Sequence, residues 1–501
     1  MEAIIALDIG STGAKAGLVS REGRLLATGY AGYPTRTPAS QQVEQSPEDW
    51  WAAVCVALGQ LWGAAALPTV EIAGVALIGQ MQDTILLGPG GALGNAILYS
   101  DSRAGAEAGE IERRMGAAWL TERTGNLQGG SSVLAKWLWL QRNEPARLAA
   151  ADTLLLGAHD YIGWRLCGVA ASDFTTASTT GLLDLAANDW LWDVIDGLGL
   201  GHEKLPALLP ASAVMGSLHP GAAQATGIPA GTPVFHGSGD LGATTVGVGA
   251  GLPGRAYCYL GTSGWIAASF DRATPNPEAG LFTLRHPQPK RLIQVAPMLT
   301  AGGNLEWVRG VLGQGTPLAY AEMERLAGGT SPGSRGVLYL PYLAGERSPF
   351  TDPDARACFV GMGVDTTSGD LARSVLEGTA LAYRSLCRVL GLGAGEPLLL
   401  AGGGGKSALW SQILADVLNR PIQILADPGS AAVVGAAILA GAGLGWYESL
   451  FPDESFFPIA TGFEPNLAHS QRYDDLYEIF DALYPHLGDS FGALARLRQA
   501  R

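Results

Sequence analysis

Cysteine is scarce in this sequence. Its 501 residues contain five cysteines, which lie far apart and include no Cys-x-x-Cys pair: Cys55, Cys167, Cys258, Cys358 and Cys387. An odd number at such spacing argues against a disulfide framework and against a thiolate zinc site. The first ten residues carry Glu2 and Asp8 and no cationic segment, so they do not resemble a secretory signal peptide. We therefore expect a cytoplasmic protein.

Positive charge and long hydrophobic runs are scarce too. Lysine and arginine total 32 against 46 aspartates and glutamates, a net charge of −14, and no basic cluster stands out. Nucleic acids and anionic membranes are therefore not expected partners. The longest uncharged stretch, 429–447, is rich in alanine and glycine rather than leucine and isoleucine. It predicts a closely packed helix in a soluble core rather than a membrane span.

Apolar residues and glycine, in contrast, are abundant. Apolar residues make up 47% of the chain, and its length predicts about two to four domains. The 70 glycines are about twice ordinary usage, so short glycine motifs arise by chance. Gly237, Gly239 and Gly242 match a dinucleotide fingerprint and keep an NAD-dependent dehydrogenase as an alternative, but no acidic residue lies about 20 positions further on. Residues 400–407 fail as a P-loop because Leu400 replaces its first glycine.

A rarer motif occurs twice. The tetrad Gly-[Ser/Thr]-[Ser/Thr]-Gly stands at 10–13 and again at 261–264, each time after a short apolar run, where composition predicts about 0.1 matches. The 251-residue separation suggests two similar halves. Backbone N–H groups and hydroxyls in such turns are the donors that phosphate oxygens need, so two of them predict a phosphate-binding cleft. Ordinary hairpin turns are the alternative.

The remaining pattern predicts α/β structure in both halves. The first half should contain a hairpin with strands at 14–20 and 25–30, a helix at 47–62 capped by Ser46, and a buried strand at 72–78. For the second half we expect strands at 337–340 and 398–401 and helices at 368–390 and 407–418. The glycine-rich stretch 241–255 is the natural boundary, which divides the chain into domains 1–249 and 250–501.

Two aspartates are placed for chemistry. Asp8 closes the strand before the first tetrad, and Asp240 follows the run PVFHGSG, which predicts a strand leading into a helix. Phosphoryl transfer needs one or two carboxylates for Mg²⁺ and one base for a hydroxyl proton. Two aspartates and two phosphate turns provide these groups, although each aspartate alone is also typical of a helix N-cap or a turn.

Eight segments together resemble the sequence pattern of one protein family. LDIGSTGAK, GQM, ILYSDSR, KWLWLQRNEP, SGDLGATTVGVG, LGTSG, PYLAGERSP and AGGGGKSALWSQILAD occur in this order. The sequence resembles the FGGY carbohydrate kinases, and most of all their xylulokinase branch. The resemblance implies a two-domain α/β fold of the actin/hexokinase/Hsp70 (ribonuclease H-like) type, whose central cleft closes on a sugar and ATP-Mg²⁺. It also suggests a homodimer.

The resemblance implies roles for individual residues. Asp240 matches the catalytic base, and Asp8 and Asp240 match the groups near the metal. The sugar-facing positions are Gln80, Met81, Gln82, Tyr99, Asp101, Arg103 and Asp240. The nucleotide-facing positions are Asp8, Gly10, Ser11, Thr12, Lys15, Gly261, Thr262, Gly403, Gly404 and Ser407. Structural roles are the alternatives, with Met81 filling the core and Arg103 in a surface ion pair.

Two departures from the family pattern bear on the substrate. Xylulokinases typically carry histidine where this chain has Gln82, and asparagine where it has Leu241. Because polar contacts to a hydroxyl discriminate strongly, such exchanges can redirect specificity. D-Xylulose, converted to D-xylulose 5-phosphate, is the first choice, and D-ribulose, L-ketopentoses, gluconate and sugar alcohols stay open. A non-sugar ATPase of the actin or Hsp70 class is a remote alternative, because it would have no use for GQM and ILYSDSR.

Overall fold

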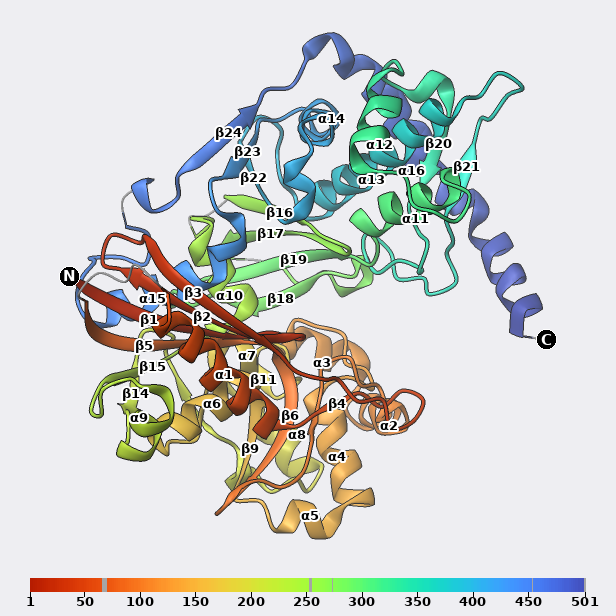
Figure 1. Cartoon of the computed structure of the whole chain (residues 1–501). Helices are drawn as coiled ribbons and strands as arrows, with labels where there is room; N and C mark the ends of the chain where they lie inside the picture. Colours follow the sequence, from red (N-terminus) through yellow and green to blue (C-terminus); the bar gives the residue numbers. More distant parts are fainter. Residues whose placement is uncertain (65–69, 252–254, 273, 453, 500–501) are drawn as a thin grey trace.

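The computed structural model describes residues 1–64, 70–251, 255–272, 274–452 and 454–499. The chain forms two α/β lobes, one built around β1–β15 and the other around β16–β24 (Figure 1). No helix in these ranges is long and apolar enough to cross a membrane. All five cysteines are free, as the spacing predicted.

The first lobe is built on a six-stranded sheet of order β14-β15-β5-β1-β2-β3. The central strand β1 pairs antiparallel with β2 and parallel with β5, which in turn pairs parallel with β15. The strands are β1 (Glu2–Ile9), β2 (Gly13–Ser20), β3 (Leu25–Gly32), β5 (Glu71–Gly79), β14 (Val214–Ser217) and β15 (Pro233–Gly239).

The second lobe repeats this arrangement in a seven-stranded sheet of order β18-β19-β17-β16-β22-β23-β24. Here β16 pairs antiparallel with β17 and parallel with β22, and β22 pairs parallel with β23. The strands are β16 (Ala256–Leu260), β17 (Gly264–Phe270), β18 (Phe282–Arg285), β19 (Leu292–Met298), β22 (Leu398–Ala401), β23 (Ile422–Leu425) and β24 (Ile459–Phe463). The two similar halves inferred from the repeated tetrad are therefore present as one strand pattern used twice.

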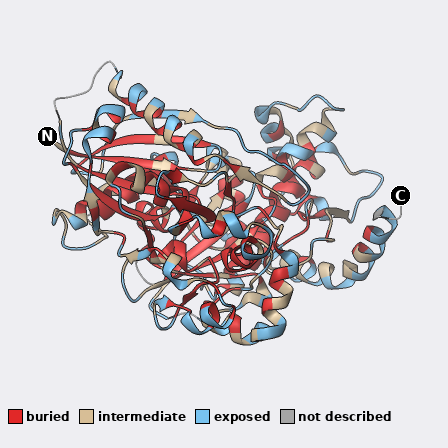
Figure 2. Ribbon diagram, turned by 90° about the horizontal axis from the view of Figure 1, so that it is seen from below, coloured by how far each residue is buried: buried red, intermediate tan, exposed pale blue. Residues whose placement is uncertain are grey.

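Helices cover both sheets. Those of the first lobe include α1 (Pro47–Trp62), α2 (Gly105–Met115), α3 (Ala117–Thr124), α4 (Val133–Asn143), α6 (Ala158–Cys167), α7 (Phe174–Ala177) and α10 (Asp240–Gly247). Those of the second half of the chain include α11 (Gly302–Leu312), α12 (Tyr320–Gly328), α13 (Ser368–Val389), α14 (Ala408–Leu418), α15 (Ala431–Gly443) and α16 (Leu467–Gln499). Figure 2 shows buried residues concentrated on the strands and the inner helix faces, while the outer faces are exposed.

Most predicted elements lie within a residue or two of the observed ones. The helix predicted at 47–62 is α1, although the Ser46 side chain makes no capping hydrogen bond, so proline at the first position and the early carboxylates start this helix. Ser407 does cap α14, because its hydroxyl accepts from the Trp410 N–H at 3.2 Å. In the glycine-rich stretch 241–255, predicted as the domain boundary, the first part is helix α10, and residues 252–254 lie outside the described residues.

Helix α15 contains most of the uncharged stretch that raised the membrane question. It comes from the second half of the sequence but packs on the first sheet, where Val433, Ala436 and Ala440 join the core residues Ile4 and Phe235. It also crosses α10 between the two lobes (Figure 1). Small residues permit this close approach: a Cβ at Gly435 would lie 1.9 Å from a backbone oxygen of α10. The alanine- and glycine-rich composition therefore serves the packing between the lobes.

Candidate active site

Two aspartates lie at the ends of the parallel strands that flank β5 in the first sheet. Asp8 lies near the end of β1, and Asp240 begins α10 directly after β15. Asp8 and Ser238 both lie opposite Ile78, on the two sides of β5, so the strands end level with one another. Because adjacent strands are about 4.8 Å apart, this register brings both carboxyl groups to one edge of the sheet. The carboxyl ends of parallel strands are where open α/β sheets bind ligands.

The two carboxylates affect each other electrostatically. Burial and the negative charge of Asp240 raise the pKa of Asp8 to about 7, against the opposing positive influence of Lys15 and His159. Asp240 reaches solvent, yet the protein around it excludes enough water to raise its pKa as well, although the Leu241 N–H donates to Asp240 Oδ1 at 2.7 Å. Two negative groups with no full countercharge form a site suited to a divalent cation.

The first glycine turn, residues 10–13, joins β1 to β2 and points its hydroxyls outward. Gln45 Nε2 donates to the Ser11 carbonyl at 2.8 Å, and the Tyr33 hydroxyl donates to another carbonyl of the turn. Ser11 and Thr12 are exposed. The turn therefore has its carbonyls tied to the protein and its hydroxyls exposed, which is a geometry that suits a phosphate.

Lys15 lies on β2 next to this turn and reaches the other lobe. Its Nζ donates to the Gly429 carbonyl at 2.8 Å, on the segment that precedes α15. The ammonium therefore links the two halves in this conformation. Its role as a nucleotide ligand stays a prediction.

The predicted sugar segment begins at the end of β5. Gln80 is 2% exposed, and its Nε2 donates to Gln45 Oε1 at 3.0 Å, which connects it to the first turn. Its Oε1 has no hydrogen-bond partner in the described chain. Gln82, the second residue of strand β6 (Met81–Gly88), lies in the left-handed region with φ of 65°. Its side chain donates to the Ser131 carbonyl at 3.3 Å. A non-glycine residue in this conformation is strained, and such strain is concentrated at binding sites.

Met81 and Leu241 join the sugar segment to the second lobe. Both are half-buried and pack, together with Trp265, against one apolar cluster that includes Tyr257. Trp265 directly follows the second turn and stacks on Tyr259 with ring centroids 4.1 Å apart. Leu241, which stands where xylulokinases typically carry asparagine, thus places an apolar group beside Asp240 at the junction of the lobes.

The three predicted sugar-facing residues of loop 99–103 make different contacts. The Tyr99 hydroxyl lies 3.2 Å from Ser11 Oγ, so it joins the sugar segment to the first turn. Arg103 forms a buried ion pair with Asp101 and Glu44, both at 2.7 Å, rather than the surface pair that was the alternative. Asp101 is fully buried, and this pair fixes the loop that carries Tyr99. Their contact with a sugar stays a prediction.

The second glycine turn, residues 261–264, joins β16 to β17 in the same way. Its Gly261 carbonyl accepts from the Gly302 N–H at 2.7 Å, and its Thr262 carbonyl accepts from Gly303 at 3.0 Å, both at the start of α11. Thr262 is exposed. Both tetrads are hairpin turns, and both keep their hydroxyls exposed at the end of a central strand.

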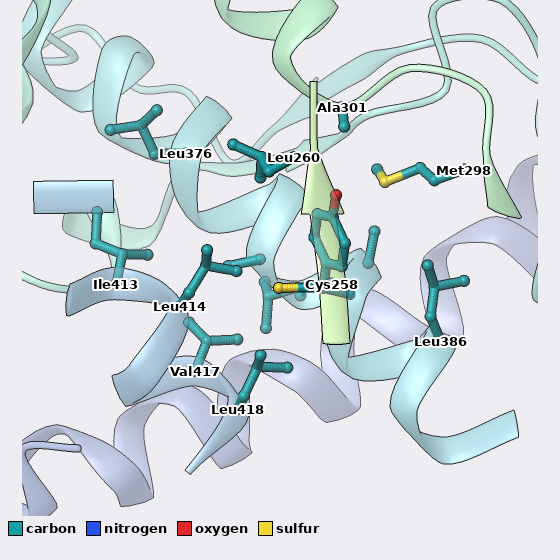
Figure 3. Close-up of a cluster of buried hydrophobic side chains, with 14 of the residues drawn as sticks. Cys258, Leu260, Met298, Ala301, Leu376, Leu386, Ile413, Leu414, Val417 and Leu418 are labelled. Carbon is teal, nitrogen blue, oxygen red and sulfur yellow. The ribbon is translucent and has the colours of Figure 1, made fainter. Parts of the chain in front are cut away.

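A cavity of about 680 Å³ adjoins the second turn. Five residues with predicted nucleotide roles line it: Gly261, Thr262, Gly403, Gly404 and Ser407. A Cβ at Gly404 would lie 1.3 Å from Leu260 Cδ2, so glycine is required for the close approach of this segment to β16. Leu260 and Leu376 belong both to the cavity wall and to the apolar core in Figure 3, which makes that wall rigid. Its volume suits a nucleoside.

Several lining residues carried no sequence signal. The same cavity is bordered by the acidic side chains of α11 and α12 and by three aromatic rings: Glu306, Glu324, Tyr259, Tyr320 and Trp410. Ser407 Oγ donates to Glu324 Oε1 at 2.5 Å, which ties the glycine-rich segment to α12. Tyr259 lies on β16 and the others on α11, α12 and α14, so only the fold assembles them.

Two carboxylates at strand ends, two anion-binding turns and a nucleoside-sized cavity define a phosphotransferase with the actin/hexokinase-type fold. Comparison with known proteins places the chain within that class. Residues 3–247 match the N-terminal domain, and residues 256–444 the C-terminal domain, of the FGGY family of carbohydrate kinases. The chain belongs to this family and is a sugar kinase, and the resemblance found in the sequence is confirmed.

Individual relatives are similar over their full length. The chain is 32% identical to the xylulose kinase of Escherichia coli, over 96% of this chain and 99% of that protein. The crystal structure of xylulose kinase from Rhodospirillum rubrum matches with a TM-score of 0.90 and 30% identity, over 98% of this chain and 100% of the other. A gluconate kinase from Lactobacillus acidophilus matches with a TM-score of 0.91 and 26% identity, over 98% and 99%. The predicted two-lobe fold is therefore confirmed.

Proposed function

We propose that this sugar kinase transfers the γ-phosphate of ATP to D-xylulose and forms D-xylulose 5-phosphate. The xylulose kinases among its relatives support this choice. The observation that carries the kinase chemistry is the level ending of β1 and β15, which brings Asp8 and Asp240 to one edge near both turns. The gluconate kinase of the same fold keeps gluconate as the second candidate.

Asp240 is the proposed base. At the start of α10 it is exposed to the cleft, and its raised pKa makes it a better proton acceptor than an ordinary aspartate. It takes the proton of the attacking sugar hydroxyl, while the exposed hydroxyls and N–H groups of the two turns hold the phosphates. Gln80, Gln82 and Tyr99 orient the sugar, and hydrogen bonds link Gln80, through Gln45, and Tyr99 to the first turn.

The residues present fit a magnesium ion. Asp8 and Asp240 offer hard oxygen donors, and burial followed by the negative charge of Asp240 raises the pKa of Asp8, an environment that a cation would relieve. A magnesium ion bound there would supply positive charge to offset that of the phosphates. Asp8 and Asp240 would hold it, and the turn at 10–13 would position the phosphates beside them.

The remaining predictions form part of the same proposal. Domain 1–249 provides the sugar site and the first phosphate turn, and domain 250–501 provides the second turn and the adenosine cavity. The enzyme acts in the cytoplasm, as the sparse cysteines and acidic balance suggest. A homodimer and the absence of nucleic-acid partners are kept as predictions.

The test is ADP release with ATP and Mg²⁺ across ketopentoses, ketohexoses, aldonates and polyols, with the product position determined by phosphorus NMR. The highest kcat/KM with D-xylulose supports the proposal, and the highest value with gluconate supports the alternative. The double variant Gln82→His/Leu241→Asn restores the residues typical of xylulokinases. If it creates D-xylulose turnover that the natural chain lacks, the two departures determine specificity and the natural substrate is another sugar.

A further inference from the structure

A compact group of ligand-type side chains lies behind the strand ends, apart from the Asp8 and Asp240 site. His159 and Asp160 open α6, Asp173 ends β10 (Ala171–Asp173), and His236 lies on β15. One ligand atom from each of the four lies within 4.8 Å of all the others. All four side chains are at most 1% exposed. None of the sequence motifs pointed to this group.

The spacing within this His159/Asp160/Asp173/His236 cluster matches a tetrahedral site. His159 Nε2 lies 3.1 Å from Asp173 Oδ2 and 3.3 Å from Asp160 Oδ1, and His236 Nε2 lies 3.1 Å from the same Asp160 oxygen. With metal–ligand bonds of about 2.0–2.2 Å, tetrahedral ligands lie about 3.3–3.6 Å apart. Three of the six ligand separations therefore already approach the distances that a bound zinc ion would set.

Hydrogen bonding leaves one oxygen of the cluster without a donor. Asp160 Oδ1 is buried and has no hydrogen-bond partner in the described chain, although two imidazole nitrogens lie within 3.3 Å. His159 Nε2 is directed to Asp173 Oδ2, and His236 Nε2 to the Ala171 carbonyl. A buried carboxylate oxygen without a donor is costly, and a cation between the four groups would remove this cost.

The opposite oxygens of both carboxylates are already held in place. Asp160 Oδ2 accepts from the N–H groups of Leu156 and Gly157 at 2.9 and 3.1 Å. Asp173 Oδ1 accepts from the N–H of Thr175 at 2.8 Å and from the next backbone N–H at 3.1 Å. Such outer hydrogen bonds orient the ligands of metal sites. The Nδ1 atoms of both histidines have no partner in the described residues, so only packing and the contacts of their Nε2 atoms orient the two rings, whose centroids are 5.3 Å apart.

The charge balance favours the same conclusion. No lysine or arginine within the described ranges forms an ion pair with Asp160 or Asp173, so the imidazoles are their only charged-type partners there, and Asp173 Oδ2 also accepts from the Thr176 hydroxyl at 2.6 Å. One divalent ion with two neutral imidazoles balances two buried carboxylates. We propose that His159, Asp160, Asp173 and His236 bind one structural zinc-class ion, distinct from the catalytic magnesium. Since Ser238 Oγ contacts Asp173 Oδ1 at 3.4 Å, the ion would fix β15 two residues before Asp240.

The first measurement is the metal content of the full chain, produced in zinc-supplemented medium and dialysed against a chelator that strips exposed sites. We expect one zinc ion per chain to be retained, because the cluster is closed to solvent. Protein refolded with Co²⁺ in place of zinc should show the intense visible absorption of a tetrahedral nitrogen and oxygen site. The carboxylate site at Asp8 and Asp240 would give only the weak spectrum of an octahedral, all-oxygen site, so the two are distinguishable.

Matched variants complete the test. His236→Gln and His159→Gln should lose the retained zinc and the cobalt bands, and zinc should no longer protect the protein against thermal unfolding. His202→Gln is the control, because His202 pairs with Asp196 at 3.0 Å on the exposed surface and should leave both signals unchanged. Folded, natural protein that retains no zinc and shows no tetrahedral cobalt spectrum overturns the proposal, whether or not the variants fold. The four groups would then form a metal-free ion-pair network.

Discussion

Asp8 and Asp240 stand at the ends of two strands that flank the same partner, β5, and both carboxyl groups have a raised pKa. The two aspartates are far apart in the sequence, and only the parallel pairing of β1, β5 and β15 brings them together. This pairing of like charges is unfavourable in the free protein and becomes useful when a cation and phosphates occupy the cleft.

The first prediction concerns the base. Asp240→Asn removes the proton acceptor and keeps the shape of the side chain, so kcat should fall by at least about 10²-fold while the circular dichroism spectrum is retained. Asp196→Asn, at an exposed aspartate far from the strand ends, is the control and should keep full turnover. Near-normal kcat in Asp240→Asn would remove this residue from the proposed mechanism.

The second prediction concerns stability and pH. The folded-state pKa of Asp8, about 7, lies above the ordinary value of 3.8, so its ionisation destabilises the native state increasingly as pH rises from about 4 to 7. Asp8→Asn should therefore unfold at a higher temperature than the natural chain at pH 8 without Mg²⁺, by up to about 4 kcal/mol in free energy, and at a similar temperature at pH 4. Thermal melts at both pH values measure this, and the same variant should lose activity.

Asp184 provides a control of opposite sign for that experiment. Although burial works against it, the Ala187 N–H and Arg123 hold the pKa of Asp184 below its usual range. A lowered pKa stabilises the fold above the unfolded-state value, so Asp184→Asn should unfold at a lower temperature at pH 8. If both variants shift the melting temperature in the same direction, the charge-based account of Asp8 is wrong.

The third prediction tests the cavity. In Gly404→Ala the new methyl group would lie 1.3 Å from Leu260 Cδ2, so the segment must move away from β16. We expect KM for ATP to rise about tenfold or more, with little change in KM for the sugar, because a displacement of this size disturbs one binding wall. Gly405→Ala is the matched control, since its methyl group meets its nearest neighbours at 3.6 Å, and unchanged ATP kinetics are expected there.

The fourth prediction concerns strain in the sugar segment. Gln82 and Gln41 are both glutamines with φ of 65°. Replacement of either by glycine relieves an unfavourable backbone conformation, so the free energy of unfolding should change by a similar, small amount, about 1 kcal/mol or less. Only Gln82→Gly should raise KM for the sugar, which steady-state kinetics will show. Equal effects of the two variants on the sugar KM would mean that Gln82 does not contact the substrate.

The sequence by itself determined a great deal. Hydrophobic periodicity and the residues at element ends predicted α1, the β2–β3 hairpin, β22 and α14 closely. Proline, glycine and capping residues mark such boundaries locally. The repeated tetrad predicted two similar halves, and the ordered motifs identified the sugar-kinase family. These features are local, or linear in the chain, so no knowledge of contacts was needed.

Only the tertiary structure decided how distant segments meet. It placed α15 from the second half against the first sheet, made the Arg103 pair a buried one, and added Glu324 and Tyr320 to the cavity from helix α12. It also brought the His159/Asp160/Asp173/His236 cluster together from α6, β10 and β15. Such contacts depend on sheet order and helix packing, which join residues as far apart as His236 and Ala171 and leave no periodic trace in the sequence.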